Sequence, residues 1–251
     1  MSVRATAIVR GKVNAPRLRK CAGGFSLIEL SFTIIVIALL LGGLLVPLST
    51  QVDQRHYART EKQLEHIHEA LIGFALANRH LPCPAVSATN GSEDRDTSTN
   101  QCTKRDGFVP WVTLGVTPAD AWNNLIRYSV DPDFARSDPN FFFTLGDKGD
   151  LHIHTRDEAG NELDLTNSEI PAVILSHGKN GFGATSSDGL PRFEPAGWTG
   201  DERDNRYNAT QYYYRTRTEV TTASGGAFDD VITWLSLNQL VARMVGAGRL
   251  P

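Results

Sequence analysis

One carboxylate stands alone in an otherwise apolar stretch near the start of the chain. Residues 25–48 contain no ionisable side chain except Glu29. A carboxylate at the depth of membrane hydrocarbon costs a few kcal/mol even on lenient insertion scales, so such acids are normally paired or functional. The sequence therefore predicts that Glu29 has a positively charged partner.

A second group of oxygen-bearing side chains lies close to position 200. It consists of Asp201, Glu202, Asp204 and Asn205. Oxygen ligands at such close spacing suit calcium, although arginines interrupt the run and the spacing is not that of an EF-hand. A calcium site is one interpretation, but the interrupting arginines favour a solvated loop. The sequence therefore predicts no metal site and no other cofactor.

Three fragments resemble enzymatic or metal sites only superficially. The glycine-rich stretch 176–183 lacks the Gly-Lys-Ser/Thr ending of a phosphate-binding loop. His152 and His154 share one face of a predicted strand without a third ligand nearby, and His66 and His68 point to different sides of a helix. No Ser/His/Asp or Cys/His constellation is evident, so we predict a protein that is not an enzyme.

The apolar stretch around Glu29 is long enough to span a membrane as a helix. As a helix, the 24 residues from 25 to 48 span about 36 Å, enough to cross a bilayer core of about 30 Å. Six Lys or Arg residues and no acid precede this stretch, which predicts a cytoplasmic N-terminus and an exported remainder. An ordinary signal peptide is the alternative, but it has a shorter apolar stretch and small residues after it.

Charge argues against one class of function. The formal net charge of the chain is −3, and removing the six cations of the leader leaves −9. An exported domain this acidic is not expected to bind nucleic acid.

The segment Gly24-Phe25-Ser26-Leu27-Ile28-Glu29-Leu30 resembles the type IV prepilin signature, which pilins and the pseudopilins of type II secretion share. The resemblance implies that a prepilin peptidase cuts after Gly24 and that Phe25 is then N-methylated. It also implies that Glu29 pairs with the N-terminal amine of a neighbouring subunit during assembly. The alternative is that Glu29 merely reaches the membrane interface near the helix N-terminus.

The same resemblance implies the partners and the location. The partners are the prepilin peptidase, other pilins or pseudopilins, an inner-membrane assembly platform and membrane lipid. The location is the inner membrane, with a single pass, a cytoplasmic N-terminus and a periplasmic C-terminal domain. The size of that domain favours a minor subunit, and the presence of Glu29 argues against the type II tip subunit.

Two functions of other classes compete with this prediction. One is a membrane-anchored periplasmic binding or sensor domain that does not polymerise, and the other is an anchored hydrolase. The N-terminal signal does not distinguish a pilus from a secretion pseudopilus or a DNA-uptake fibre.

The predicted organisation has four segments. Residues 1–24 form a removed leader, 25–48 the membrane and assembly half of a long helix, 49–80 its amphipathic half, and 81–251 a periplasmic globular domain. The amphipathic half carries apolar residues at helical spacing, namely Leu64, Ile67, Leu71 and Phe74.

The cysteines support export. Cys83 and Cys102 bracket a polar, turn-rich loop, whereas Cys21 lies in the leader. An even pair in an oxidising compartment predicts a disulfide, and the rival metal-binding interpretation lacks nearby histidines.

Beyond the cysteines, β-rich runs bounded by turn residues predict strands at 125–130, 141–145, 172–176 and 212–217, with a hairpin over 151–165. A stripe from Phe228 to Met244, with Asp229 and Asp230 near its start, predicts a C-terminal helix. The predicted fold is α+β and pilin-like, with a long N-terminal helix packed on an antiparallel sheet.

Two details of the globular domain also resemble pseudopilins. Asp120, Trp122 and Tyr128 match a turn-and-strand pattern, with Asn123 where glycine is usual, and Asn is the next best residue for a left-handed backbone. Some pseudopilins bind calcium in a loop of the region around position 200.

Overall fold

The computed structural model describes residues 24–138, 143–144, 146–166 and 170–250, without the side chains of residues 41–49. The chain divides into two compact units, Met1–Ser49 and Thr50–Pro251, and each is described by itself. Residues 1–23 of the predicted leader lie outside the described residues, as does most of the strand predicted at 141–145.

Helix α1 (Leu27–Asn78) carries the predicted apolar stripe in the second unit. Leu64, Ile67 and Leu71 on this helix are buried, as the spacing predicted, whereas Phe74 is only partly buried. The helix ends where Arg79 adopts a left-handed conformation with φ of 68° and donates its N–H to the Ala75 carbonyl at 2.8 Å. The prolines that follow cannot continue the helical hydrogen bonding.

The predicted membrane-spanning half of this helix is corrected by the structure. Among the described residues, no helix is both long enough and apolar enough to cross a membrane. The prediction of a pilin-like fold with a long apolar N-terminal helix is therefore wrong in this respect.

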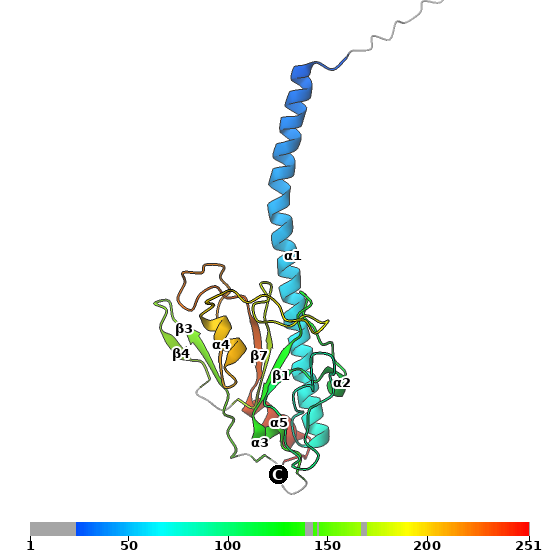
Figure 1. Ribbon diagram of the computed structural model, residues 1–251, viewed down its shortest axis with the longest axis vertical. Helices are drawn as coiled ribbons and strands as arrows, with labels where there is room; N and C mark the ends of the chain where they lie inside the picture. Colours follow the sequence, from blue (N-terminus) through cyan, green and yellow to red (C-terminus); the bar gives the residue numbers. More distant parts are fainter. Residues whose placement is uncertain (1–23, 139–142, 145, 167–169, 251) are drawn as a thin grey trace, which may run out of the picture. The chain divides into compact units, whose positions relative to one another are not determined.

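A four-stranded antiparallel sheet forms the centre of the second unit (Figure 1). Its order is β1 (Asp106–Phe108), β2 (Arg127–Val130), β5 (Ala172–Ser176) and β7 (Val231–Leu235). The α+β class and the strands predicted at 125–130 and 172–176 are confirmed.

A second sheet has the order β4 (Glu162–Asp164), β3 (His152–Arg156) and β6 (Gln211–Tyr213). The β3–β4 pair is antiparallel, so the predicted hairpin is confirmed. Strand β6 instead pairs with β3 in parallel, because the chain first crosses through β5 and the short helix α4 (Asp201–Tyr207). The sequence did not predict this second, mixed sheet.

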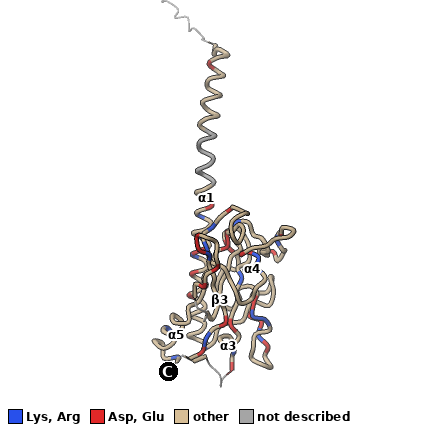
Figure 2. Tube along the Cα trace, turned by 90° about the vertical axis from the view of Figure 1, so that its left-hand side faces the viewer, with Lys and Arg blue, Asp and Glu red and all other residues tan. Residues whose placement is uncertain are grey.

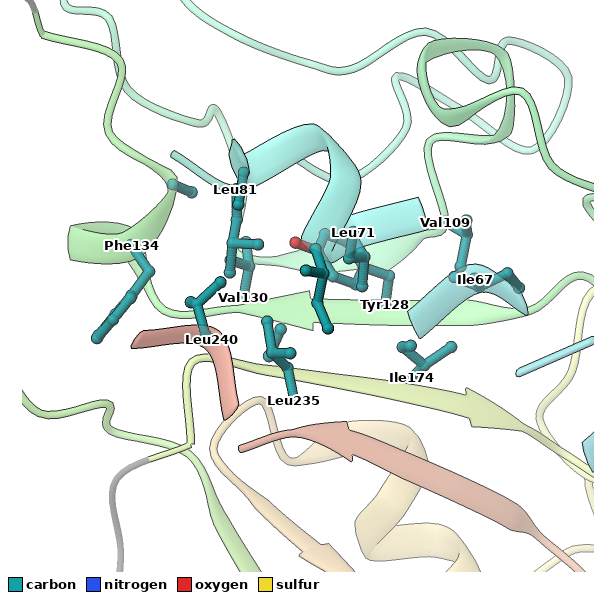
Figure 3. Packing of buried hydrophobic residues seen from close by; sticks show 14 of the residues in the cluster. Ile67, Leu71, Leu81, Val109, Tyr128, Val130, Phe134, Ile174, Leu235 and Leu240 are labelled. Carbon is teal, nitrogen blue, oxygen red and sulfur yellow. The ribbon is translucent and has the colours of Figure 1, made fainter. Parts of the chain in front are cut away.

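Strand β5 holds two hydrophobic cores together, one on each face of the central sheet. Ala172 and Ile174 belong to the core shared with α1, whereas Val173 and Leu175 belong to the core shared with the second sheet. In Figure 3 the side chains of Ile67 and Leu71 point from α1 toward the sheet that carries Tyr128 and Ile174. Burial on both faces explains why this strand is continuously apolar rather than alternating.

The C-terminal segment forms a strand and then a helix. Helix α5 (Leu237–Gly246) buries Leu240 and Met244, which confirms a C-terminal helix. Its predicted first half is wrong, because residues from Val231 to Leu235 form β7 and pair with β5. The β-branched and aromatic residues of this run favour a strand. The same residues also fit a helical spacing, and pairing with β5 selects the strand.

Two local predictions near the sheet are confirmed. Cys83 and Cys102 form a disulfide. Asn123 has φ of 66°, the left-handed conformation expected where glycine is usual. Asp120 fixes this turn, because its Oδ1 accepts hydrogen bonds from the N–H groups of Trp122 at 2.9 Å and Asn124 at 2.8 Å.

The second unit also contains two short helices, α2 (Trp111–Leu114) and α3 (Pro132–Ala135).

Replacing Leu71 with alanine tests the packing of α1. We expect Leu71→Ala to lower the free energy of unfolding by about 2–5 kcal/mol, because it opens a cavity in a fully buried core. Leu190→Ala, at an exposed loop position, is the matched control and should cost less than about 0.5 kcal/mol. Equal effects in urea denaturation would contradict the packing described here.

Candidate functional site

The pairing of β5 with β7 brings two loops together. The last pair of the ladder is Ser176 with Val231. Residues 177–181, which leave β5, therefore lie beside Asp229 and Asp230, which enter β7. The first turn of α4 adds Glu202 to the same place.

Three carboxylates converge at this point. Each of Glu202, Asp229 and Asp230 offers one oxygen, and these oxygens lie within 4.8 Å of one another. Asn180 ties two of them together, since its side-chain amide donates to Glu202 Oε2 at 3.0 Å and its N–H donates to Asp229 Oδ2 at 2.7 Å. The N–H of Asp229 also donates to Glu202 Oε1 at 2.5 Å.

The innermost carboxylate is that of Asp230. Asn205 donates to its Oδ2 at 2.7 Å, while the Asn205 Oδ1 accepts the N–H of Tyr213 at 2.6 Å. His177 is fully buried, and its Nδ1 lies 3.6 Å from the other Asp230 oxygen. This separation is too long for a hydrogen bond, and neither ring nitrogen of His177 has a hydrogen-bond partner in the described structure.

Gly178 is required for the close approach of the two loops. Its φ is 58°, and a Cβ atom there would lie 2.3 Å from the Asp229 carbonyl oxygen. A side chain at this position would force Asp229 out of the cluster.

Burial dominates the electrostatics of the cluster. Burial, followed by the negative charge of Asp230, raises the pKa of Glu202 to about 7. Burial and the charge of Glu202 raise the pKa of Asp229 to about 8, and burial raises that of Asp230 to about 8. Burial also lowers the pKa of His177 to about 3, so this imidazole stays neutral beside the acids.

The donor set fits a hard cation. Calcium holds its oxygen ligands at about 2.3–2.6 Å, so two ligand oxygens can be at most about 5.2 Å apart. The three carboxylate oxygens, all within 4.8 Å of one another, meet this limit. The buried Asp229 Oδ1 has no hydrogen-bond partner in the described structure. Asp229 also lines a groove of about 400 Å³ together with Tyr57 and Lys179, which gives the cluster access to solvent.

Two of the four polar residues noted near position 200 take part in the cluster, and two do not. Glu202 belongs to the cluster, and Asn205 holds Asp230 in place. Asp201 points elsewhere, because Arg156 binds it with two nitrogens and Arg215 Nε lies 2.9 Å from its Oδ2. The Asp204 carbonyl accepts the N–H that closes α4.

The other members of the cluster were not predicted from the sequence. Asp229 and Asp230 were expected at the start of a helix, and the stretch 176–183 was considered only as a phosphate-binding loop. The adjacent Asp-Asp pair directly before a β-branched run was the available signal, because acids there lie at a strand end rather than in a helical turn. Only the β5–β7 register shows which loop faces them.

The predicted assembly residues lie in the first unit. Gly24 and Phe25 precede α1, and a Cβ atom on Gly24 would meet no heavy atom within 4 Å. Phe25 is 80% exposed. Glu29 lies in the first turn of α1 and is also exposed.

Ser176 and the histidine pair of β3 contact acidic side chains outside the cluster. Ser176 donates its hydroxyl to Asp120 at 2.6 Å rather than to His177. The rings of His152 and His154 stack at 6.3 Å on one face of β3, and Nδ1 of His154 lies 2.7 Å from Asp164.

Comparison with known proteins adds no further constraint. The chain matches no protein-family model, no curated protein and no solved structure.

The raised pKa values predict how stability depends on pH when cations are removed. The folded pKa values of about 7 to 8 exceed the ordinary carboxyl values, so the folded chain binds more protons than the unfolded chain between about pH 4 and pH 8. In a chelating buffer, the free energy of unfolding should therefore fall on the order of 1–3 kcal/mol as the pH rises from 5 to 8.

Asp230→Asn should flatten this slope, whereas Glu158→Gln in an exposed turn should leave it unchanged. Urea unfolding at each pH measures the effect. A slope that Asp230→Asn does not alter would contradict the assignment.

Proposed function

We propose that the chain is a non-enzymatic, pilin-like structural subunit. In this proposal a prepilin peptidase cuts after Gly24, Phe25 is methylated, and the subunit enters a type IV pilus or a type II secretion pseudopilus as a minor component. The observation that carries the proposal is the sequence Gly24–Leu30 together with its accessibility. A peptidase needs an extended, reachable bond, and Gly24 and Phe25 are exposed and precede the first helical residue.

The side chains that follow the junction support an assembly role. Most large apolar side chains from Leu27 to Leu40 are more than half exposed, with Leu27 at 86% and Leu39 at 72%. An exposed apolar surface of this kind favours burial against lipid or protein. Glu29 lies among these side chains, where a neighbour's α-amino group would neutralise its charge.

Export of the second unit is part of the proposal. The Cys83–Cys102 disulfide supports a periplasmic location, because such bonds persist in oxidising compartments. The six cations before Gly24 support a cytoplasmic N-terminus and an inner-membrane starting point. The partners would be the peptidase, the assembly platform and neighbouring subunits.

We further propose that the acidic cluster binds calcium. Glu202, Asp229 and Asp230 would supply the carboxylate oxygens, and Asn180 and Asn205 would hold those carboxylates in place. Bound calcium would supply the positive charge that three buried acids lack at neutral pH. Its role would be structural, because the cluster joins the loop after β5, α4 and the start of β7.

The N-terminus of the mature chain tests the proposed function. We expect mass spectrometry of the chain purified from its host to show an N-terminal, methylated Phe25. Glu29→Ala should leave this processing intact and lower incorporation into sheared fibres at least about tenfold, because the charge partner of the new amine is lost. Glu158→Ala, which also removes an exposed acid, is the matched control and should be processed and incorporated normally.

Two outcomes would contradict the proposal. An intact leader would exclude the prepilin pathway. Normal fibre entry by the Glu29→Ala variant would exclude the pairing of Glu29 with an amine.

Calcium addition tests the proposed cation site. At pH 7.5, saturating calcium should raise the melting temperature of the chelator-treated chain by several degrees, because a ligand that binds only the folded state stabilises it. Glu202→Gln combined with Asp230→Asn should abolish this rise, and Glu158→Gln should retain it. A rise of equal size in the double variant would place the cation elsewhere.

A further inference from the structure

The two edges of the central sheet differ in how they are covered. At one edge, β1 is three residues long and begins with the charged Asp106, and its Phe108 carbonyl accepts the N–H of Ala85 at 2.8 Å. At the other edge, no strand of the described chain pairs with the outer side of β7, and the backbone hydrogen bonds of the described loops do not reach it. The central sheet therefore has one covered edge and one edge without a strand partner.

The composition of β7 lacks the features that usually protect an edge strand. Its five residues, Val231–Leu235, are all β-branched, aromatic or aliphatic, and include no charged residue, glycine or proline. Natural edge strands are commonly protected by lysine, proline, a bulge or short length. A strand of the composition of β7 instead favours pairing with a further strand, as in domains that bind extended peptides at a sheet edge.

A groove of about 540 Å³ lies against this edge. Residues from both faces of β7 line it, with Val231 and Thr233 on the face toward α1 and Ile232 and Trp234 on the face toward the second sheet. Because successive side chains of a strand point to opposite faces, a hollow that touches both faces lies at the edge itself. The groove therefore occupies the place where an added strand would lie.

Helix α1 forms the opposite wall of this groove and makes it acidic. Glu61, Glu65 and Glu69 all line the groove, and all three are exposed. Figure 2 shows acidic positions in red along this part of α1, together with basic positions of the same helix. Successive glutamates are four residues apart, which is about 6 Å along a helix. Alternate residues of a strand are about 6.8 Å apart, so the side chains on one face of an added strand would match the three glutamates in spacing.

Two of the three glutamates already bind guanidinium groups of the same chain. Arg243 pairs with Glu69 at 2.7 Å, and Arg217 lies 3.8 Å from Glu61. Glu65, between them, forms no ion pair with any described residue. The middle of the groove therefore carries a negative charge that a Lys or Arg from outside the chain can compensate.

The face of β7 away from α1 offers aromatic contacts instead of charge. Trp234 packs against the core shared with the second sheet, and its ring meets that of Tyr214 edge to face at 5.6 Å. Tyr214 is 46% exposed. An added strand would thus meet glutamates on one face and aromatic rings on the other, which favours cationic and apolar side chains in alternation.

We infer that the free edge of β7 binds an extended segment of a partner protein in which Lys or Arg alternates with apolar residues. Backbone hydrogen bonds to β7 hold the segment as a fifth strand, and the three glutamates of the groove select its cations. Charge favours such a partner over a second copy of the chain. The unit Thr50–Pro251 holds 19 Lys or Arg and 27 Asp or Glu, a formal net charge of −8, so another copy brings like charge to an acidic groove.

A fluorescent heptapeptide, acetyl-Lys-Val-Lys-Val-Lys-Val-Lys-amide, tests this inference on the full-length chain. We expect it to bind in fluorescence anisotropy at pH 7.5, and the matching peptide with Glu in place of Lys not to bind. Glu65→Lys should weaken binding at least about tenfold, because a like charge then faces the lysines. Glu158→Lys, which reverses an exposed charge in the turn after β3, is the matched control and should bind like the natural chain.

A second peptide separates strand pairing from attraction between charges alone. The same heptapeptide with every backbone nitrogen methylated keeps its charge but cannot donate backbone hydrogen bonds, so it should bind at least about tenfold more weakly. Binding of the unmethylated peptide should also slow amide hydrogen exchange in residues 231–235 and leave exchange in β1 unchanged. Equal binding of the two peptides, or slowed exchange confined to other strands, would overturn the inference.

Three further outcomes would also contradict the inference. They are failure of the lysine peptide to bind, binding of the acidic peptide, and undiminished binding by Glu65→Lys, with unchanged melting temperatures showing that the variants are folded. If the lysine peptide does not bind and Glu65→Lys weakens self-association in sedimentation velocity, the edge pairs with a second copy instead. None of these results depends on cleavage after Gly24, so loss of peptide binding leaves the prepilin pathway standing.

Discussion

The antiparallel pairing of β5 with β7 determines most of the second unit. Five residue pairs, from Ala172 with Leu235 to Ser176 with Val231, fix the register. Because side chains alternate across a sheet, this register sends Ile174 toward the core with α1 and Val173 and Leu175 toward the core with the second sheet. A slip of one residue would exchange the two faces and leave both cores incomplete. The same register brings Asn180 to Asp229, so the packing of the cores also builds the acidic cluster.

The cluster shows a conflict between packing and charge. The hydrophobic cores favour close approach of the β5 loop, α4 and the start of β7, yet this approach confines three carboxylates within 4.8 Å. Burying like charges together is unfavourable unless protons or a cation neutralise them. Hydrogen bonds from Asn180 and Asn205 offset part of this cost but add no positive charge. The buried His177 adds none either, since its pKa of about 3 keeps it neutral.

Sequence patterns predicted the features that depend on local periodicity or local chemistry. The apolar stripe on α1, the β3–β4 hairpin, β5, the disulfide and the left-handed Asn123 all follow from neighbours within a few residues or from cysteine pairing. The second sheet and β7 were not predicted because they depend on pairing between distant segments. The segment from Val231 to Leu235 satisfies a helical spacing as well as a strand composition, and its pairing with β5 decides between them. The long apolar N-terminal helix was wrong, because no helix in the described part of the chain is both long enough and apolar enough to cross a membrane.

The two units differ in how far their apolar side chains are buried within the chain. The second unit closes its own cores, and its large buried side chains, such as Leu71 and Tyr128, need no partner chain. The first unit leaves Phe25, Leu27 and Ile28 more than three-quarters exposed. Covering this apolar surface with lipid or protein would lower the free energy. Lipid and neighbouring helices both satisfy an apolar surface, but lipid does not neutralise Glu29. In the proposed assembly, the end of a neighbouring chain would do both, because its amine would compensate the carboxylate while its side chains would cover the helix. That combined requirement supports the proposed assembly over simple anchoring.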